Sequence, residues 1–509
     1  MIAASAPAQA RTQQMPADRL RSGARLLRLE FRHSAMLWLV PLAAGLFWYN
    51  AYRPVMAMPA LWSLRAPSMQ HNALLDFVLP VVGAATWMGS RESRRGTGDL
   101  TAIVARPRWT RQLIAWAALT AWALAGYAIC VGAVYGVTAA QAAWGGPLWW
   151  PAAVGAAGLP ALAAIGFAAG TWFPSRFTTP LVSIGTFMLL GFSTQFAHGA
   201  TSLWQASPTI SGVSGIGPDA GVATFYPYLP DLPIAQVMFA VGLAAMVLGT
   251  LGLPAASGSR RVRAASAMTA AAGLIAVTTA AGLISTSRFE RHGMLAIPAL
   301  HDASSDRPIA YQPVCGQAAI PVCMNPAFVS YLPVVTSALR PLLTEVAGLP
   351  QAPARILQAA PTFSQLSYND VAVRDAAGIR IIAGARVLLA SMPDQLPGER
   401  QPDVTSAQYA MQVRAQVGDA LVGILVGEGS GQAQQAVRAG LLMASGVRFA
   451  GPGFRGDGLG MTLRGPAPGS AVSDAARRFA ALPAAARRAW LNSHLTAVRA
   501  GRITLGQVP

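Results

Sequence analysis

The residues of this sequence that could do chemistry do not stand at the spacings of a known catalytic site. Neither the HExxH pattern of zinc proteases nor the GxSxG pattern of serine hydrolases occurs. His292, His301 and His494 are not at metal-ligand spacings. The sequence contains no lysine, which a Walker A loop needs to reach the nucleotide phosphates. We therefore expect this chain to bind no metal or cofactor directly, and any ATP that drives it, with its Mg²⁺, to bind another subunit.

The most informative residues lie between Ser90 and Gln112, where positive charge is concentrated between two long uncharged stretches. Because arginine is retained on the cytoplasmic side of membranes, this segment is typical of a cytoplasmic loop between membrane spans. Its arginines are Arg91, Arg94, Arg95, Arg106, Arg108 and Arg111.

The composition predicts an integral membrane protein. A soluble chain of 509 residues with 53% hydrophobic and 11% charged residues could hardly bury its apolar side chains in cores. A net charge of +18 would suit binding to nucleic acid. The positive charge is, however, spread along the chain, since residues 1–287 hold 18 arginines and 7 acidic residues and the remainder holds 20 arginines and 13 acidic residues. Since no basic domain stands apart, membrane topology explains the arginines better than nucleic acid, and we expect no nucleic acid partner.

Seven apolar stretches are each close to the length of about twenty residues that crosses the hydrocarbon of a bilayer. They cover approximately residues 34–51, 72–90, 112–137, 149–172, 180–197, 234–253 and 265–286. The last stretch is rich in Ala, Thr and Gly and is the least hydrophobic of the set. The sequence thus predicts an α-helical polytopic membrane protein with about six to seven transmembrane helices.

Charge in the loops predicts the orientation of these spans. The second, fourth and sixth loops carry arginines, whereas the third has no charge and the fifth only Asp219 and Asp231. The N-terminus is therefore expected in the cytoplasm and the C-terminal part outside the plasma membrane, and the arginine- and alanine-rich composition suggests a bacterium. Asp76 would then lie near the outer end of the second span, where contact with headgroups is favoured over a substrate or proton site.

The N-terminal segments differ in pattern. Residues 1–16 have no apolar period and are expected to be disordered, whereas residues 17–33 repeat apolar and basic residues at helical spacing. We interpret residues 17–33 as an amphipathic helix on the inner leaflet; a solvated basic helix before the first span is the alternative.

Residues 287–509 are expected to form a mixed α/β extracytoplasmic domain behind a transmembrane domain of residues 34–286. Helical spacing covers 326–346, 406–426, 431–445 and 483–500, and residues 371–389 have the composition of short strands. Cys315 and Cys323 are close enough to form a disulfide in an oxidising compartment, with a reduced pair or a metal site as alternatives.

The second loop resembles the first cytoplasmic loop of ABC-2-type exporter permeases, which shows an acidic residue, a Gly-Thr pair, an acidic-apolar pair and a proline beside a basic residue. The matching and flanking residues are Arg91, Glu92, Arg95, Gly96, Thr97, Asp99, Leu100, Arg106, Pro107 and Arg108. In that family the segment forms a coupling helix in a groove of the ATP-binding subunit. The resemblance covers about residues 17–255.

This resemblance implies the membrane-spanning permease subunit of an ABC exporter, with ATP and Mg²⁺ in an ATP-binding cassette partner. A second permease subunit, identical or paralogous, would face it across the pathway in the lipid bilayer. The apolar spans favour a lipophilic drug, lipid or peptide as substrate. A membrane-anchored scaffold or sensor with an external ligand-binding domain is the alternative, and a membrane-tethered hydrolase is a third hypothesis.

Overall fold

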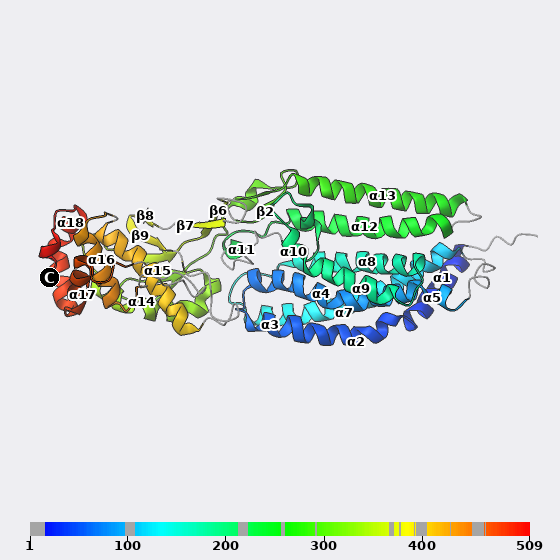
Figure 1. The fold of residues 1–509 in the computed structure, drawn as a ribbon, viewed down its shortest axis with the longest axis horizontal. Helices are drawn as coiled ribbons and strands as arrows, with labels where there is room; N and C mark the ends of the chain where they lie inside the picture. Colours follow the sequence, from blue (N-terminus) through cyan, green and yellow to red (C-terminus); the bar gives the residue numbers. More distant parts are fainter. Residues whose placement is uncertain are drawn as a thin grey trace, which may run out of the picture.

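The computed structural model describes residues 16–96, 107–211, 222–255, 260–290, 293–365, 371–375, 378–390, 392, 405–427, 429–449, 463 and 465–509. The molecule is mostly helical and elongated. A bundle of apolar helices forms one end, and a C-terminal domain that begins after the last bundle helix forms the other (Figure 1).

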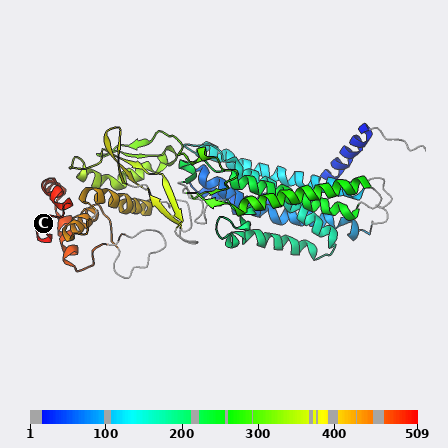
Figure 2. The ribbon, with the colours of Figure 1, turned by 90° about the horizontal axis from the view of Figure 1, so that it is seen from above.

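The bundle contains helices long and apolar enough to cross a membrane. Its elements are α1 (Pro16–Arg32), α2 (Ala35–Phe47), η1 (Trp48–Tyr52), α3 (Arg53–Ala57), α4 (Trp62–Gly89), α5 (Arg91–Arg94), α7 (Arg108–Gln141), α8 (Trp149–Trp172), α9 (Thr178–Gly191), α10 (Ser193–Phe196), α12 (Asp231–Ala255) and α13 (Arg260–Ser285). Residues 35–57 run as one helical stretch through the π-helical η1, at 46° to the end of α1. Figure 2 shows α1 leaving the bundle axis at its free end.

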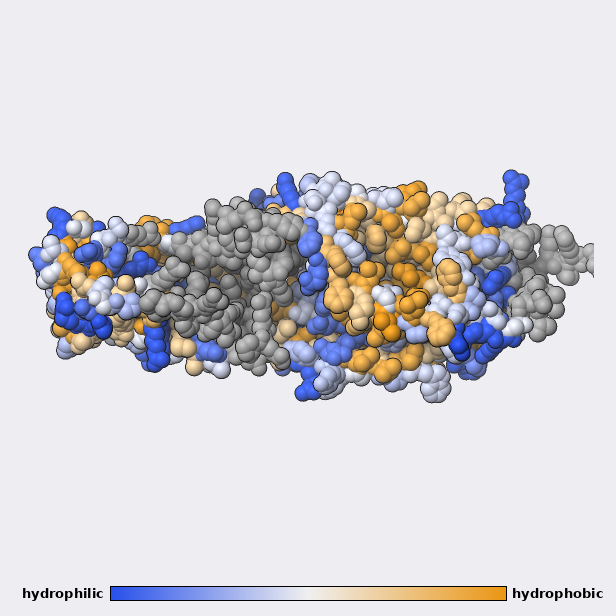
Figure 3. All heavy atoms as spheres, in the orientation of Figure 1, coloured by the Kyte–Doolittle hydropathy of each residue, from blue (hydrophilic) through white to orange (hydrophobic). Residues whose placement is uncertain are grey.

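On the face seen in Figure 3, the bundle has an apolar surface between two polar ends. Large apolar side chains are exposed on the bundle, including Trp38 on α2, Ile129 on α7, Leu181 on α9 and Ile275 on α13. A surface of this extent is not stable in water, whereas it suits the hydrocarbon of a bilayer.

Among the described helices, six pass as candidate spans, or seven if the bent segment from Gly23 to Ala57 counts as one. One of the six, Pro326–Val346, lies in the C-terminal domain (Figure 1). Its side chains, among them Leu339 and Leu343, pack against a sheet and other helices, so we assign it to the core of that domain.

The predicted span at 72–90 was too short, because α4 begins ten residues earlier, at Trp62. Arg65 lies inside this extension and is only 3% exposed. Its guanidinium donates to Gln141 Oε1 at 2.8 Å, to Thr138 Oγ1 at 3.3 Å and to the carbonyl of Met58 at 2.9 Å. A buried arginine is tolerated in a helix when such acceptors surround it, which a charge count does not reveal.

Asp76 lies 14 residues after Trp62 and 13 before Gly89 on α4. Its expected place near the outer end of the span stays a prediction, because the first residues of α4, among them Leu64, belong to the core of the C-terminal domain. The predicted fifth span at 180–197 changes too, since α9 has only 14 residues and a break at Phe192 separates it from α10.

Helices α4 and α8 approach closely because glycines stand at their contact. A Cβ at Gly170 would lie 2.1 Å from the carbonyl oxygen of Thr86, and one at Gly166 would lie 2.7 Å from that of Val82. From the other side, a Cβ at Gly89 would lie 2.2 Å from the carbonyl oxygen of Phe167. Small residues of this kind let membrane helices pack backbone to backbone.

The described residues between α10 and α12, 197–211 and 222–230, lie at the end of the bundle that faces the C-terminal domain. They include the 3₁₀ turn η2 (Leu203–Ala206) and α11 (Val222–Phe225). Gln70 on α4 donates to the carbonyls of Pro208 and Ile210 at 3.0 Å, and Gln236 on α12 donates to that of Ile210 at 2.8 Å. These side chains satisfy backbone carbonyls that have no strand or helix partner.

The C-terminal domain contains a five-stranded sheet in the order β3-β4-β5-β9-β8, in which β4, β5 and β9 are parallel and the edges antiparallel. The strands are β3 (Val314–Gly316), β4 (Val322–Met324), β5 (Arg355–Gln358), β8 (Gly378–Ile382) and β9 (Ala385–Ala390), with separate pairs β1 (Arg288–Phe289) with β2 (Leu295–Ala296) and β6 (Pro361–Gln365) with β7 (Val371–Asp375). The helices are α14 (Leu332–Val346), α15 (Ser406–Val426), α16 (Gln432–Ala444), α17 (Ala471–Ala481) and α18 (Ala484–Arg499).

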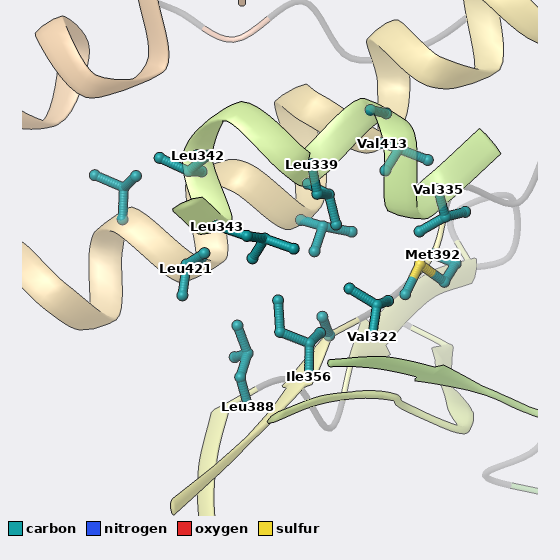
Figure 4. Close-up of a cluster of buried hydrophobic side chains, with 14 of the residues drawn as sticks. Val322, Val335, Leu339, Leu342, Leu343, Ile356, Leu388, Met392, Val413 and Leu421 are labelled. Carbon is teal, nitrogen blue, oxygen red and sulfur yellow. The ribbon is translucent and has the colours of Figure 1, made fainter. Parts of the chain in front are cut away.

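The core of this domain lies between the sheet and helices α14 and α15. Figure 4 shows Ile356 and Leu388 of the sheet facing Leu343 on α14 and Leu421 on α15. The helices predicted at 326–346 and 406–426 are confirmed at these bounds, whereas α17 and the strands β3, β4 and β5 were not predicted. Residues 451–469, which are rich in glycine and proline, lie mostly outside the described residues.

A disulfide joins Cys315 to Cys323. The two residues stand directly opposite each other on the antiparallel strands β3 and β4. Cys130, on α7, is the free cysteine and is buried.

Aromatic side chains connect the bundle to the C-terminal domain. Phe225 of α11 stacks against Phe328 with ring centroids 6.3 Å apart, and meets Tyr311 edge-on at 5.6 Å. The backbone N–H of Ile309 also donates to the carbonyl of Phe225 at 2.7 Å. Leu64 of α4 belongs to the same hydrophobic cluster, so the end of α4 is part of the core of the C-terminal domain.

The glycine contact between α4 and α8 predicts the effect of one methyl group. Gly170→Ala should lower the stability of the bundle by about 1–3 kcal/mol, because the helices must separate to admit the new Cβ. Gly132→Ala on α7 is the matched control, since its Cβ would meet no atom within 4 Å. Unfolding of both variants in mixed detergent micelles checks this, and equal stability of the two would contradict it.

The disulfide predicts a second stability effect. Cys315→Ser with Cys323→Ser should lower the unfolding free energy of the C-terminal domain by roughly 2–3 kcal/mol, because a closed loop of this length restricts the unfolded chain. The measurement is thermal unfolding of the full chain followed by proteolysis of the domain. Cys130→Ser, which breaks no disulfide, should leave that transition unchanged.

Candidate docking site at the arginine-rich end of the bundle

The described parts of the second, fourth and sixth loops, which carry most of the arginines of the bundle, lie at one end of it, whereas Arg53 on α3 lies at the other end. The C-terminal ends of α4, α8 and α12 meet the N-terminal ends of α7, α9 and α13 at the arginine-rich end, opposite the C-terminal domain (Figure 1). Figure 3 shows hydrophilic residues gathered at this end. The arginines of its described loops and helix ends are Arg25, Arg28, Arg32, Arg91, Arg94, Arg95, Arg108, Arg111, Arg176, Arg260, Arg261 and Arg263.

Helix α5 is a single turn that continues the chain from the C-terminal end of α4. Arg94 folds back over this end, with its guanidinium carbon 3.3 Å from the ring centroid of Trp87. The same guanidinium donates to the carbonyl of Trp87 at 2.7 Å and to Ser90 Oγ at 3.0 Å. A cation at the C-terminal end of a helix is favourable because unpaired carbonyls point there. Arg94 therefore fixes α5 relative to α4.

An ion pair joins α5 to α1. Arg91 donates to both oxygens of Glu30, at 2.8 and 3.0 Å, in the two-pronged geometry that suits arginine and a carboxylate. The Glu30 side chain is 13% exposed, so solvent screens this pair only in part. Hydrogen bonding to Glu30 raises the pKa of Arg91 above its ordinary value.

A second set of ion pairs closes the base of the loop between α4 and α7. Glu92 on α5 accepts from Arg108 Nε at 3.0 Å and lies 3.6 Å from the guanidinium of Arg111. Both arginines belong to the first turn of α7, which Pro107 precedes as N-cap. The described chain on either side of residues 97–106, at Gly96 and at Pro107, is thus held together by these ion pairs.

Tryptophans attach this base to the neighbouring helices. Trp122 on α7 donates through Nε1 to the carbonyl of Phe31 at 2.9 Å and stacks on its ring at 4.4 Å. Trp109, also on α7, donates to the carbonyl of Leu248 on α12 at 2.8 Å. The base of the loop is consequently connected to α1, α4, α7 and α12.

The structure brings together four of the predicted site residues. Arg91 and Glu92 lie on α5, and Pro107 and Arg108 begin α7. Arg95 and Gly96 follow α5 and are exposed, and Gly96 has a φ of +62°, which glycine adopts without strain. Thr97, Asp99, Leu100 and Arg106 lie outside the described residues.

Sequence reasoning missed Glu30, although one signal could have found it. Glu30 is an acidic residue within a segment that carries four arginines between Arg21 and Arg32. An isolated acid on a basic helix beside a basic loop indicates a pair between the two. Arg94 was counted only as a topology signal, because its contact with Trp87 depends on the tight turn of α5.

The side chains at this site are of the kind that bind a charged partner surface. Its described ionisable groups are arginines paired with carboxylates or exposed to solvent, and no group of three or more His, Cys, Asp or Glu residues within the described ranges could hold a metal ion. Exposed arginines such as Arg95 favour a partner surface with negative charge. No family model, curated protein or solved structure matches this chain.

The pair between Arg91 and Glu30 predicts the stability of the loop base. Glu30→Gln should weaken the attachment of α5 to α1 by roughly 1–2 kcal/mol, because the amide cannot serve as a charged two-oxygen acceptor. Hydrogen–deuterium exchange should then rise in residues 90–96. Glu290→Gln, which removes the partner of the exposed Arg288 at the other end of the bundle, is the control and should leave this exchange unchanged.

Proposed function

We propose that this chain is the membrane-spanning subunit of an ATP-driven exporter in the plasma membrane of a bacterium. The arginine-rich end faces the cytoplasm in this proposal, because arginine is retained on that side, and the C-terminal domain stands outside. Two copies, or this chain and a paralogue, enclose the pathway. A separate ATP-binding cassette subunit binds ATP and Mg²⁺ beneath each of them.

The observation that carries the proposal is the braced base of the loop between α4 and α7. Arg91 ties α5 to α1, Glu92 ties it to α7, and Arg94 holds it on the end of α4. A force applied by a partner to this loop therefore acts on three helices at once. An unbraced linker would absorb the same force without moving the bundle.

The connection at the other end of the bundle supports a role for the C-terminal domain in the same movement. Leu64 of α4 and Phe225 of α11 lie in the hydrophobic core that this domain builds with Phe328. A shift of α4 is thereby transmitted to the domain, which acts in our proposal as a lid over the pathway, a dock for a partner or a relay. The apolar bundle favours a lipophilic drug, lipid or peptide as cargo.

A cavity in the C-terminal domain favours a second candidate, a membrane-anchored sensor or scaffold with an external ligand-binding domain. The cavity has a volume of about 260 Å³ and lies beside α15 and α16. Its lining combines the ion pair of Asp419 and Arg438, joined at 2.6 and 2.8 Å, with apolar groups such as Leu442 and Phe449. Polar groups in an apolar pocket can orient a small ligand.

Affinity purification of the tagged chain from its native membrane distinguishes the two candidates. The exporter predicts a stoichiometric ATP-binding cassette subunit in the purified complex. Glu92→Arg with Asp99→Arg should abolish its recovery, because both changes place positive charge where the resemblance assigns acidic contact residues.

The matched control reverses two acidic residues of the C-terminal domain, Asp302→Arg with Asp474→Arg, and should retain the ATPase. Both control residues are exposed, so the same change in net charge occurs far from the docking loop. Recovery of an intact chain without any ATPase would overturn the exporter and leave the sensor. Loss of the ATPase in the control as well would show that net charge, rather than the loop, governs recovery.

A further inference from the structure

Asp76 is a buried carboxyl on α4 that no part of the proposed function uses. The residue is 7% exposed. Its Oδ1 accepts a hydrogen bond from Asn50 Nδ2 at 3.0 Å, whereas its Oδ2 is closed off from the surface and has no hydrogen-bond partner. No arginine or histidine in the described part of the chain lies within ion-pair distance of it.

The backbone around Asp76 is irregular on both sides of the contact. Asn50 belongs to the π-helical turn η1, and insertions of this kind occur frequently at functional sites. On α4, Pro80 has no N–H to donate to the carbonyl of Asp76, which lies four residues earlier. Asp76 therefore presents an unpaired carboxylate oxygen and a backbone carbonyl that lacks its usual helical donor.

Because Asp76 is buried and no cation pairs with it, the protonated form of its carboxyl is favoured over the ionised form. An ionised aspartate within a membrane helix is unfavourable, because hydrocarbon solvates its charge poorly. A single amide donor from Asn50 offsets part of this cost, and no second donor reaches Oδ2. A proton is the one ligand of a carboxylate that needs no opening in the protein, so it fits the closed Oδ2.

We propose that Asp76 is a proton-binding site, which holds its proton while α2 and α4 are packed together and releases it when water reaches Oδ2. Asn50 is exposed on the surface of the bundle and covers Asp76 from the side of η1. Water can therefore reach Oδ2 once this side of α2 moves away from α4. On release, the O–H bond of the carboxyl breaks and the proton passes to water, and no other reactant is needed.

This site goes beyond the exporter and does not depend on it. An exporter driven by a separate ATPase needs no protonatable group in its spans. Proton binding at Asp76 would make the packing of α2 on α4 responsive to pH in either candidate function.

Infrared spectroscopy of the full chain at pH 7, in micelles of a detergent that has no carbonyl group, tests the site. Solvated carboxyls are ionised at this pH, so a carboxylic C=O stretching band reports a buried protonated acid. The wild-type protein should show such a band, and Asp76→Asn, which keeps the shape of the side chain, should lose it. Absence of the band in the wild type, or its persistence in the variant, would overturn the proposal.

A second variant keeps the test decisive if Asp76→Asn does not fold. Asn50→Val removes the donor to Oδ1 and leaves the carboxyl in place. The band should remain in this variant and shift in frequency, because the C=O group loses a hydrogen bond. A band with unchanged frequency would assign the protonated carboxyl to another residue. Transfer into D₂O should shift the wild-type band slowly, since the site is closed, and an immediate shift would contradict the closed geometry.

Discussion

The close packing of α4 against α8 is the contact on which the remaining structure depends. Hydrocarbon around a bundle gives no hydrophobic drive for its helices to associate, so van der Waals contact between well-fitted surfaces must hold them together. Gly166 and Gly170 provide such a surface by bringing α8 onto the backbone of α4. Since α4 also packs against α2, α7 and α9, its position sets that of the whole bundle.

Polar groups were the part of this structure that sequence patterns predicted least well. The apolar spans were located to within a few residues for α7, α8, α12 and α13, because the thickness of a bilayer limits where an apolar run can end. The start of α4 was missed because Arg65 reads as a loop residue until its acceptors on α7 are known. The strands β3, β4 and β5 have three or four residues each, too few to show a period.

The sequence predicted where the candidate site lies along the chain, but not which of its side chains contact one another. The arginine cluster around Arg91 and Glu92 was visible in the sequence, whereas the partner Glu30 stands 61 residues away from Arg91 along the chain. A pair between residues so far apart in the chain depends on how α1 packs against α7. The stacking of Phe31 on Trp122 fixes this packing. Periodicity within one segment carries no information on contacts of this range. The ion pair between Arg91 and Glu30 nevertheless attaches the base of this loop to α1.

The two halves of α4 are attached to different parts of the molecule, and Pro80 lies between them. On one side, Val82 and Thr86 meet the glycines of α8, and α5 follows with its ion pairs. On the other side, Gln70 holds the loop that ends near Ile210, and Leu64 lies in the core of the C-terminal domain. A proline within a helix removes a hydrogen bond and permits bending at that point. A bend of α4 at Pro80 would therefore act on the contact of Asp76 with Asn50, one helical turn away, and so on the packing of α2 and η1 against α4.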